Sequence, residues 1–424
     1  MNQFLNELKW RGFLHSSTQG VEEHLAKGNV TGYIGFDPTA ASLHVGSLLP
    51  IMGLVHLQRC GHTPIAVAGG GTGMVGDPSG KTQERKFLSR DELDENLIGI
   101  KKQLLHFLDF KSKINPAVLI NNAEWLIELS FMGFLRDVGK HFSVNEMLAK
   151  DSVKSRLDQE HGMSFTEFSY SLLQAYDFLE LYDRYKCTLQ MGGSDQWGNI
   201  VSGIDLVRRL RGGEAHGIVF PLITTSAGVK FGKTESGTVW LDLNLTSPYK
   251  FYQFWYNSDD RDVIQYLKFF TFLPEHEIQE LEMKVRTQPQ NREAQTSLAS
   301  TVTDMVHGKD ATDKALNASS ILFGGEIKDV DEDDLLEIFG DVPSTNMAKD
   351  QFGGDGALMV DVLVKAGVVP SKSEARRSML SGGIYVNNLR VTDITKRVNV
   401  HDAIKGRFLV LRKGAKNYSL VRIV

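Results

Sequence analysis

Two apolar stretches that each end in glycine constrain the fold of this chain most strongly. They occupy residues 30–37 (VTGYIGFD) and 64–70 (PIAVAGG), and each has the length of one buried strand. The segment SLLPIMGLVHLQRCG between them has helical spacing of its apolar residues and a glycine at its end. A strand, a helix and a strand in this order predict a right-handed βαβ unit with parallel strands.

The pattern continues through the first half of the chain. Residues 187–195 and 218–224 are apolar and predict later strands of the same sheet, and residues 164–185 and 196–211 predict helices. We therefore expect a doubly wound, Rossmann-like α/β domain over residues 1–246.

The second half is expected to contain three further parts. Residues 247–323 predict a helical domain, and the acidic, glycine-rich residues 324–356 predict a linker. Residues 357–424 predict a small α+β unit, in which a helix precedes the strand IYVNN, an Asn-Asn turn and a hairpin.

Charge is distributed unevenly along the chain, whose net charge is −5. Residues 357–424 hold 6 Lys and 7 Arg against four acidic side chains, a net charge of +9, which leaves −14 for the rest. A basic unit on an acidic body indicates a polyanion partner, although a solvated basic surface without a partner has the same composition.

Cellular location can be estimated from cysteines and apolar runs. The two cysteines, Cys60 and Cys187, lie far apart, so they offer neither a disulfide framework nor zinc-ligand spacing, and we expect a reducing, cytoplasmic compartment. The amino terminus lacks the core of a signal peptide, and no apolar run approaches the roughly 18 residues of a membrane span. We expect no membrane partner.

Two glycine-rich loops are candidates for phosphate binding. GGGTGMVGDPSGKT contains Gly71-x-Gly73-x-x-Gly76, a formal match to the dinucleotide fingerprint, but it follows the second strand rather than the first. TTSAGVKFGKTESG places Lys230 and Lys233 three residues apart among glycines, which suits a polyphosphate. Taken alone, the first loop could instead be a glycine-rich turn in a sheet, and the second could be an exposed turn with solvated lysines.

Polar residues also gather where strands and helices meet. His44 and Gly46 fall where a helix starts, and a helix start favours an anion, although such a histidine is more often packed or on the surface. Tyr170, Gln174 and Asp177 are at i, i+4 and i+7 and so share one helical face, which would ordinarily face solvent.

Together these segments resemble the class I aminoacyl-tRNA synthetases. PTAASLHVGS resembles the first signature of that class, and KFGKT resembles its lysine-rich second signature. YIGFDPTAASLHVG, GDPSGKTQER, FLRDVGKHFSVNEML, SFTEFSYSLLQAYDF, QMGGSDQWGNI and KFGKTESGTVWLD resemble the blocks of bacterial tyrosyl-tRNA synthetases, in their order. The similarity covers essentially the whole chain, with an S4-like RNA-binding unit at 357–424.

The resemblance implies a reaction and its partners. L-tyrosine is activated by ATP to tyrosyl-adenylate with release of pyrophosphate, and the tyrosyl group passes to the 3′ end of tRNA(Tyr). Mg²⁺ accompanies ATP, and no metal site of the protein's own is visible in the sequence. The family is a homodimer, with the region around FLRDVGKHFSVN near its interface.

The resemblance also implies residue roles. The catalytic set is Thr39, His44, Lys81, Lys230, Lys233 and Thr234. The tyrosine-binding set is Tyr33, Asp77, Tyr170, Gln174, Asp177 and Gln190, with Asp177 and Tyr33 on the phenol. The ATP-binding set is Gly35, Asp37, Gly46, Ser47, Gly193, Asp195 and Gln196. The RNA-binding set is Lys372, Arg376, Arg377, Arg390, Arg412 and Lys413.

One residue departs from the family pattern. Ser47 stands where the first signature usually has its second histidine, near the ribose of ATP. Serine can still donate and accept a hydrogen bond, but it is shorter and cannot become cationic.

Three other functions are compatible with parts of the sequence. A tryptophanyl-type synthetase shares the fold and both signatures, an NAD-linked oxidoreductase would use the glycine fingerprint, and an RNA-binding protein could carry an inactive synthetase body. Amino-acid-dependent exchange between ATP and pyrophosphate separates all three.

Overall fold

The chain divides into two compact units in a computed structural model. The first contains Met1–Thr246 and Ser258–Leu298, and the second contains Ser247–Asn257 and Ala299–Val424. The structure describes residues 2–79, 88–157, 162–226, 228, 231–234, 237–322, 325, 327, 332–340, 342–414 and 417–424.

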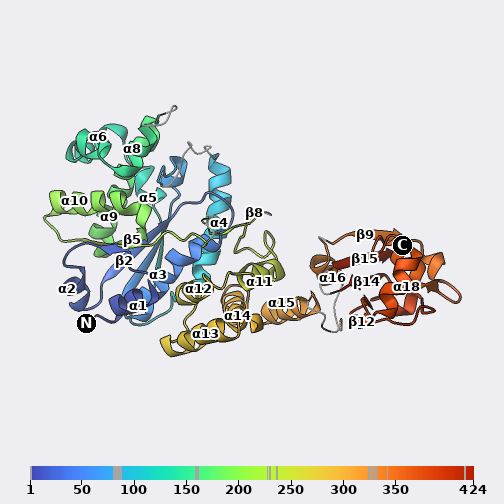
Figure 1. Cartoon of the computed structure of the whole chain (residues 1–424). Helices are drawn as coiled ribbons and strands as arrows, with labels where there is room; N and C mark the ends of the chain where they lie inside the picture. The colour runs from blue at the N-terminus through green and yellow to red at the C-terminus, as the bar shows by residue number, and fades with distance from the viewer. Residues whose placement is uncertain are drawn as a thin grey trace. The chain divides into compact units, whose positions relative to one another are not determined.

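A six-stranded sheet forms the centre of the first unit, in the order β1-β6-β5-β2-β3-β4. Figure 1 labels two of its neighbouring strands, β2 and β5. Its strands are β1 (Ser16–Ser17), β2 (Thr31–Phe36), β3 (Thr63–Ala68), β4 (Val118–Asn121), β5 (Cys187–Gly193) and β6 (His216–Phe220). All neighbours pair in parallel except β1, which pairs antiparallel with β6 at the edge. The predicted α/β class and parallel pairing are confirmed, whereas the sequence did not indicate the short strands β1 and β4.

Helices cover both faces of this sheet. The helix α3 packs against β2 and β3 on one face, and α9 and α10 pack on each other and on β5. The helices that lie wholly in the first unit are α1 (Gln3–Arg11), α2 (Val21–Ala26), α3 (Leu48–Arg59), α4 (Arg90–Phe107), α5 (Ala123–Leu126), α6 (Phe131–Asp137), α7 (Val144–Leu148), α8 (Asp151–Leu157), α9 (Phe165–Tyr185), α10 (Trp197–Arg211), α12 (Val263–Phe270) and α13 (Glu275–Thr287). None of the helices in the described ranges has an apolar run long enough to cross a membrane.

The position of α9 is set by its cap and by an apolar core. Ser164 precedes the helix and its side chain accepts a hydrogen bond from the backbone N–H of Glu167, so the helix begins at Phe165. Phe178 of α9 is fully buried and packs edge-on against the Tyr33 ring, with 5.3 Å between ring centroids. Burial of such large rings holds the polar face of α9 at a fixed distance from β2.

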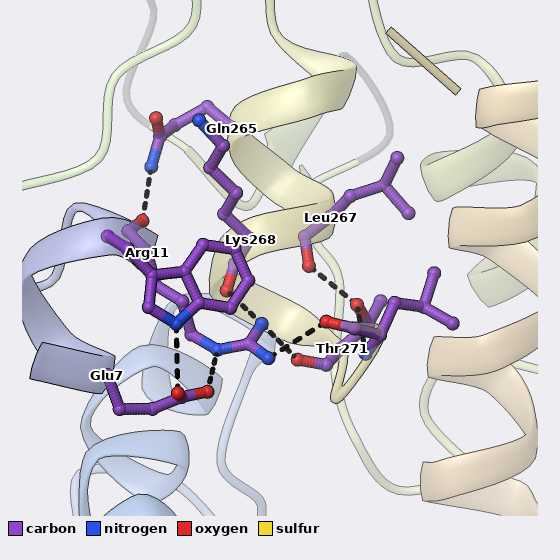
Figure 2. A network of polar contacts seen from close by, with 8 residues as sticks. Glu7, Arg11, Gln265, Leu267, Lys268 and Thr271 are labelled. Carbon is purple, nitrogen blue, oxygen red and sulfur yellow. Dashed lines mark hydrogen bonds and ion pairs between the residues drawn. The ribbon is translucent and has the colours of Figure 1, made fainter. Parts of the chain in front are cut away.

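Arg11 joins the first helix to the segment that follows the predicted domain boundary at 247 (Figure 2). Arg11 is 2% exposed, and its guanidinium donates to the backbone carbonyls of Lys268, Thr271 and Leu273 at 2.9–3.0 Å. The carbonyls of Lys268 and Thr271 belong to the end of α12, where a cation stabilises the negative end of the helix, and Leu273 follows it. Glu7 accepts from the same guanidinium at 2.6 Å. Residues 258–298 therefore fold with the first unit rather than with the predicted helical domain.

The second unit contains a five-stranded sheet in the order β12-β11-β14-β15-β9. Its strands, with the separate pair β10 and β13, are β9 (Ser344–Met347), β10 (Ala357–Leu358), β11 (Ile384–Val386), β12 (Leu389–Arg390), β13 (Arg397–Val398), β14 (Phe408–Lys413) and β15 (Asn417–Ile423). Asn387 and Asn388 have φ angles of 48° and 63°, so the predicted Asn-Asn turn joins β11 to β12 in the left-handed conformation that asparagine tolerates.

Helices of the second unit accompany this sheet. They are α11 (Pro248–Tyr256), α15 (Lys309–Leu322), α16 (Glu332–Ile338), α17 (Met359–Lys365) and α18 (Lys372–Leu380), while α14 (Glu293–His307) crosses the division between the units. The range 324–356, predicted as a linker, includes α16 and β9, and β9 pairs in parallel with β15. Buried Leu335 and Met347 explain the difference, because their apolar side chains join the core of this unit.

Candidate active site

A cleft of about 390 Å³ lies at the carboxyl ends of β2, β3 and β5 in the first unit. This is the edge where ligands bind in an open α/β sheet, and β2 and β5 are the neighbours between which the strand order reverses. The predicted tyrosine, ATP and catalytic residues that line it are Tyr33, Gly35, Asp37, Thr39, His44, Gly46, Ser47, Asp77, Tyr170, Gln174, Asp177, Gln190, Gly193, Asp195 and Gln196.

A buried carboxylate and a buried phenol hydroxyl lie in the wall of this cleft. Asp177 is 4% exposed, and its oxygens accept hydrogen bonds from Asn122 Nδ2 at 2.9 Å and Trp125 Nε1 at 2.7 Å. Tyr33 lies on β2, and its Oη is buried without a hydrogen-bond partner among the described residues. Because an unpaired buried hydroxyl is costly, this oxygen marks a position where a polar ligand group would be stabilised.

Burial controls the protonation of both groups. It raises the pKa of Asp177 to about 7, while the hydrogen bonds from Asn122 and Trp125 act in the opposite direction. Burial, and then the Asp177 carboxylate, raise the pKa of the Tyr33 hydroxyl well above its usual value. Tyr33 therefore remains a hydrogen-bond donor at neutral pH. Asp177 gains or loses its proton close to neutral pH.

Asp37 connects the ends of two strands to α9. Its oxygens accept hydrogen bonds from Tyr170 Oη at 2.9 Å and Thr72 Oγ1 at 2.8 Å. A side chain at Gly69 would place its Cβ 2.2 Å from Asp37 Oδ1, so only glycine fits there. This contact joins Tyr170, predicted to bind tyrosine, to Asp37, predicted to bind ATP.

A second polar network crosses the cleft. Gln196 donates to Asp77 at 2.6 Å, and Asn199 donates to Gln196 at 3.2 Å and to Gln174 at 3.0 Å. Gln190 is buried beside them, and its Oε1 has no hydrogen-bond partner within the described ranges. The network fixes the amide orientations around the cleft and leaves this acceptor for a ligand.

Contacts with His44 explain why position 46 of the first signature is a glycine. The backbone N–H of Gly46 donates to His44 Nδ1 at 3.0 Å, so a neutral His44 ring carries its proton on Nε2. A Cβ at Gly46 would lie 2.7 Å from His44 Cε1. Glycine is required so that the ring can cap the turn that leads into α3. Ser47 follows in this turn, and its N–H donates to the His44 carbonyl at 2.7 Å.

The second signature is attached next to the first. Lys233 begins the strand β7 (Lys233–Thr234), which pairs with β8 (Gly237–Thr238). The carbonyl of Gly232 accepts from Val239 N at 3.1 Å, and the carbonyl of Val239 accepts from Val45 N at 3.0 Å. These bonds hold the hairpin beside His44. Lys233 is exposed and does not belong to the lining residues of the cleft.

Three predicted catalytic residues cannot be placed in the same detail. Lys81 and Lys230 lie outside the described residues, and Thr234 is described only in its backbone.

The predicted RNA-binding residues lie in the second unit and differ in their contacts. Lys372 pairs with Asp361 at 2.7 Å, and Lys413 pairs with Glu374 at 2.7 Å. The others are Arg376, Arg377 and Arg390, which are exposed, and Arg412, which is 8% exposed.

Sequence reasoning did not identify four residues that orient this site: Thr72, Asn122, Trp125 and Asn199. Asn122 follows β4 directly, at the carboxyl end of a strand. The polar residue after the apolar run AVLI was the available signal, but that strand was not identified.

The glycine fingerprint lacks its expected context. Gly71 is followed by a 3₁₀ helix of three residues (Thr72–Met74), and among the described residues, which omit 80–87, the next α-helix begins at Arg90. The N–H of Gly71 donates to the Asn122 side chain at 2.8 Å, so the glycines serve the packing of the cleft. A dinucleotide site needs a helix N-terminus at this position, and an NAD-linked oxidoreductase is not favoured.

Comparisons with known proteins agree with this geometry. Residues 25–324 match the family described as tRNA synthetases class I (W and Y), and residues 334–421 match the tyrosine–tRNA ligase SYY-like C-terminal domain. Tyrosine–tRNA ligases of Roseiflexus castenholzii and Rhodopirellula baltica are 56% and 50% identical over the whole of this chain and 100% and 97% of their own lengths.

A solved structure supports the same relationship. The C-terminally truncated mitochondrial tyrosyl-tRNA synthetase of Aspergillus nidulans is 32% identical, with a TM-score of 0.70, covering 76% of this chain and 95% of its own. The tryptophanyl-type and oxidoreductase alternatives are not favoured by these relatives. The chain belongs to the tyrosine–tRNA ligase family of the class I tRNA synthetases.

Proposed function

We propose that the chain uses this cleft to activate L-tyrosine with ATP and then transfers the tyrosyl group to the 3′ end of tRNA(Tyr). The observation that carries the proposal is the pairing of a buried carboxylate with a buried, unpartnered phenol in one cleft wall. Asp177 can accept the hydrogen bond of a substrate phenol, and Tyr33 can donate to its oxygen. Phenylalanine would leave the Tyr33 hydroxyl without a partner and would not use the remaining acceptor capacity of the Asp177 carboxylate.

Activation requires two anions to meet. The tyrosine carboxylate attacks the α-phosphorus of ATP, a new O–P bond forms, and the bond to pyrophosphate breaks with its electrons on the leaving group. No covalent bond to the enzyme is needed, so positioning and charge stabilisation are sufficient. We assign Thr39, His44, Lys81, Lys230, Lys233 and Thr234 to the phosphates.

The remaining polar groups of the cleft position the two substrates. We assign the tyrosine amino group to Asp77, Tyr170 and Gln174, and we place Gln190 beside it. We assign the nucleotide to Gly35, Asp37, Gly46, Ser47, Gly193, Asp195 and Gln196. Mg²⁺ enters as part of the MgATP substrate and offsets phosphate charge.

We propose that residues 357–424 bind tRNA phosphates. We also propose that the helices of 247–323 lie on the anticodon side of the bound tRNA. The net charge of +9 over 357–424 supports this role, because phosphate contacts supply affinity that is independent of sequence. We place the reaction in the cytoplasm.

We propose a homodimer built on the segment around α6. Phe131, Met132 and Val144 are large apolar side chains that are more than half exposed there. An exposed apolar patch of this kind marks a protein contact. Sedimentation velocity of the full chain should give twice the monomer mass, and a Phe131→Asp, Met132→Asp double variant should give the monomer mass.

Exchange of labelled pyrophosphate into ATP, measured with each amino acid in turn, tests the function. We expect exchange with tyrosine alone. Exchange with tryptophan instead would support the tryptophanyl-type alternative, and no exchange with any amino acid would support an RNA-binding protein with an inactive body. Asp177→Ala is the matched variant, because it removes the phenol acceptor and leaves the ATP end of the cleft unchanged.

A further inference from the structure

Three side chains of the kind that bind metal ions come together at the amino end of β6. His24 belongs to α2, Glu214 precedes β6, and His216 begins it. One possible ligand atom of each lies within 4.8 Å of those of the other two. The proposed catalytic cleft lies at the carboxyl ends of the neighbouring strands, so this cluster takes no part in it.

His216 has the surroundings of a ligand. It is 3% exposed, and its Nε2 is buried without a hydrogen-bond partner in the described part of the chain. That nitrogen lies 3.6 Å from Glu214 Oε1. Ligand atoms bonded at about 2.0–2.2 Å around a tetrahedral zinc ion are about 3.4 Å apart. The pair is therefore already spaced almost as it would be around the ion.

His24, on α2, completes the cluster. Its ring centroid lies 4.5 Å from that of His216, and its Nε2 lies 2.8 Å from Thr188 Oγ1. A hydrogen bond to one ring nitrogen orients an imidazole and leaves the other nitrogen for a metal.

We propose that His24, Glu214 and His216 form a Zn²⁺ site, with water in the fourth position. Two imidazoles and one carboxylate are a ligand set that zinc prefers, and alkaline-earth ions, which prefer oxygen ligands, fit it less well. The ion would tie α2 to the start of β6 and stabilise the amino-terminal segment of the sheet. The sequence alone did not predict it, because His24 is far from the other two ligands in the chain.

Lys27 is the natural competitor for this site. Its Nζ lies 3.7 Å from Glu214 Oε2, and both side chains are about two thirds exposed. An exposed ion pair of this length contributes little stability, so a divalent ion can displace it. Lys27→Ala should therefore tighten zinc binding, because it removes a competing positive charge from the carboxylate.

The test is a zinc titration of the metal-free, full-length chain against a chromogenic chelator. We expect one zinc ion per chain at this site, an affinity reduced by roughly tenfold or more in Glu214→Gln, and a tighter site in Lys27→Ala. His276→Ala, which changes an exposed histidine of α13, should leave the affinity unchanged. Co²⁺ should give the intense visible absorption of a four-coordinate site in the wild-type chain and lose it in Glu214→Gln.

Glu214→Gln is the decisive variant because Glu214 is 65% exposed, so the fold does not depend on it, whereas replacement of buried His216 also tests folding. Zinc should raise the midpoint of thermal unfolding of the wild-type chain and not of this variant. Tyrosine-dependent exchange should be the same in both, so this result is independent of the proposed activity. Equal zinc affinity in wild type and Glu214→Gln, or no stoichiometric binding, would overturn the proposal.

Discussion

Polar side chains have different physical roles in the cleft and in the carboxy-terminal unit, residues 357–424. In the cleft, Asp177 and Asn122 are buried, and each is held by partners within 3.0 Å. In the carboxy-terminal unit, Arg376 and Arg377 are exposed on α18. Loss of one partner from a buried bond costs about 1–3 kcal/mol, whereas exposed charges act together and are screened over about 8–10 Å. Selectivity for a small phenol therefore depends on individual atoms, and affinity for a polyanion depends on total charge.

Arg412 shows that the distinction follows burial rather than position in the chain. It lies in the basic unit, but it is 8% exposed and its guanidinium carbon lies 3.9 Å from the centre of the Tyr385 ring. Such a contact stabilises the fold and withdraws the cation from solvent. A count of basic residues therefore overestimates how many can reach RNA.

Lys233→Ala tests the role of a single side chain at the proposed catalytic site. Of the substitutions considered, it should have the largest effect, on the rate of tyrosyl-adenylate formation. We propose that its ammonium stabilises charge that develops on pyrophosphate, and loss of one such group slows a reaction by about 10²–10³-fold. Single-turnover formation of tyrosyl-adenylate measures this rate, and tyrosine affinity by equilibrium dialysis should stay unchanged. Lys113→Ala, an exposed lysine of the same unit, is the matched control. A normal rate in Lys233→Ala would contradict the assignment.

Asp177→Ala should have the next largest effect, on selectivity rather than on ATP binding. A hydrogen bond to a charged group contributes about 1.5–3 kcal/mol, so the preference for tyrosine over phenylalanine should fall by about 10- to 150-fold. The ratio of kcat/KM for the two amino acids in pyrophosphate exchange measures it. An unchanged ratio, in a variant whose circular dichroism shows a normal fold, would count against the role of Asp177.

The pH dependence of tyrosine binding should sharpen the same contrast. Because burial raises the pKa of Asp177 from 3.8 to about 7, the acceptor carboxylate is mostly charged at pH 8 and mostly protonated at pH 6. Tyrosine affinity should therefore weaken by about tenfold as the pH falls from 8 to 6. Fluorescence titration at each pH measures it, and Asp177→Asn should remove the dependence.

The raised pKa of Asp177 also determines how the free energy of unfolding changes with pH. The folded state holds a proton on Asp177 that the unfolded state releases near pH 4, so this group favours folding at low pH. Its contribution to the free energy of unfolding is lost as the pH rises from about 4 to about 7. A flat affinity profile for tyrosine together with a flat stability profile would show that the carboxyl is not perturbed.

Much of the fold could be predicted because local patterns carry it. The apolar run 30–37 contains β2, the run 64–70 contains all of β3 except its first residue, and the spacing of Tyr170, Gln174 and Asp177 placed them on one helical face. Which way that face points could not be predicted, because it depends on how Phe178 packs α9 against the sheet.

Long-range contacts account for the differences from prediction. The domain boundary at 247 was placed from local composition, while Arg11 bonds carbonyls at Lys268, Thr271 and Leu273. No periodicity in the sequence indicates such a contact. Asn122 was missed for a related reason, since the strand before it, β4, has only four residues and is recognisable mainly from its pairing with β3.

The smallest effect is expected for substitutions of basic residues in 357–424. They test whether exposed arginines bind RNA while a buried arginine stabilises the fold. Replacing Arg376 and Arg377 together with alanine should weaken tRNA binding several-fold and reduce the slope of log affinity against log salt by about one for each phosphate that the variant no longer binds. Tyrosyl-adenylate formation should not change, because these side chains lie outside the cleft.

Arg412→Met is the matched comparison. It should lower the free energy of unfolding, because it removes the cation from the Tyr385 ring, and it should leave the salt slope of tRNA binding almost unchanged. An equal salt slope in wild type and the double variant, or a normal stability in Arg412→Met, would show that burial does not separate the two kinds of charge.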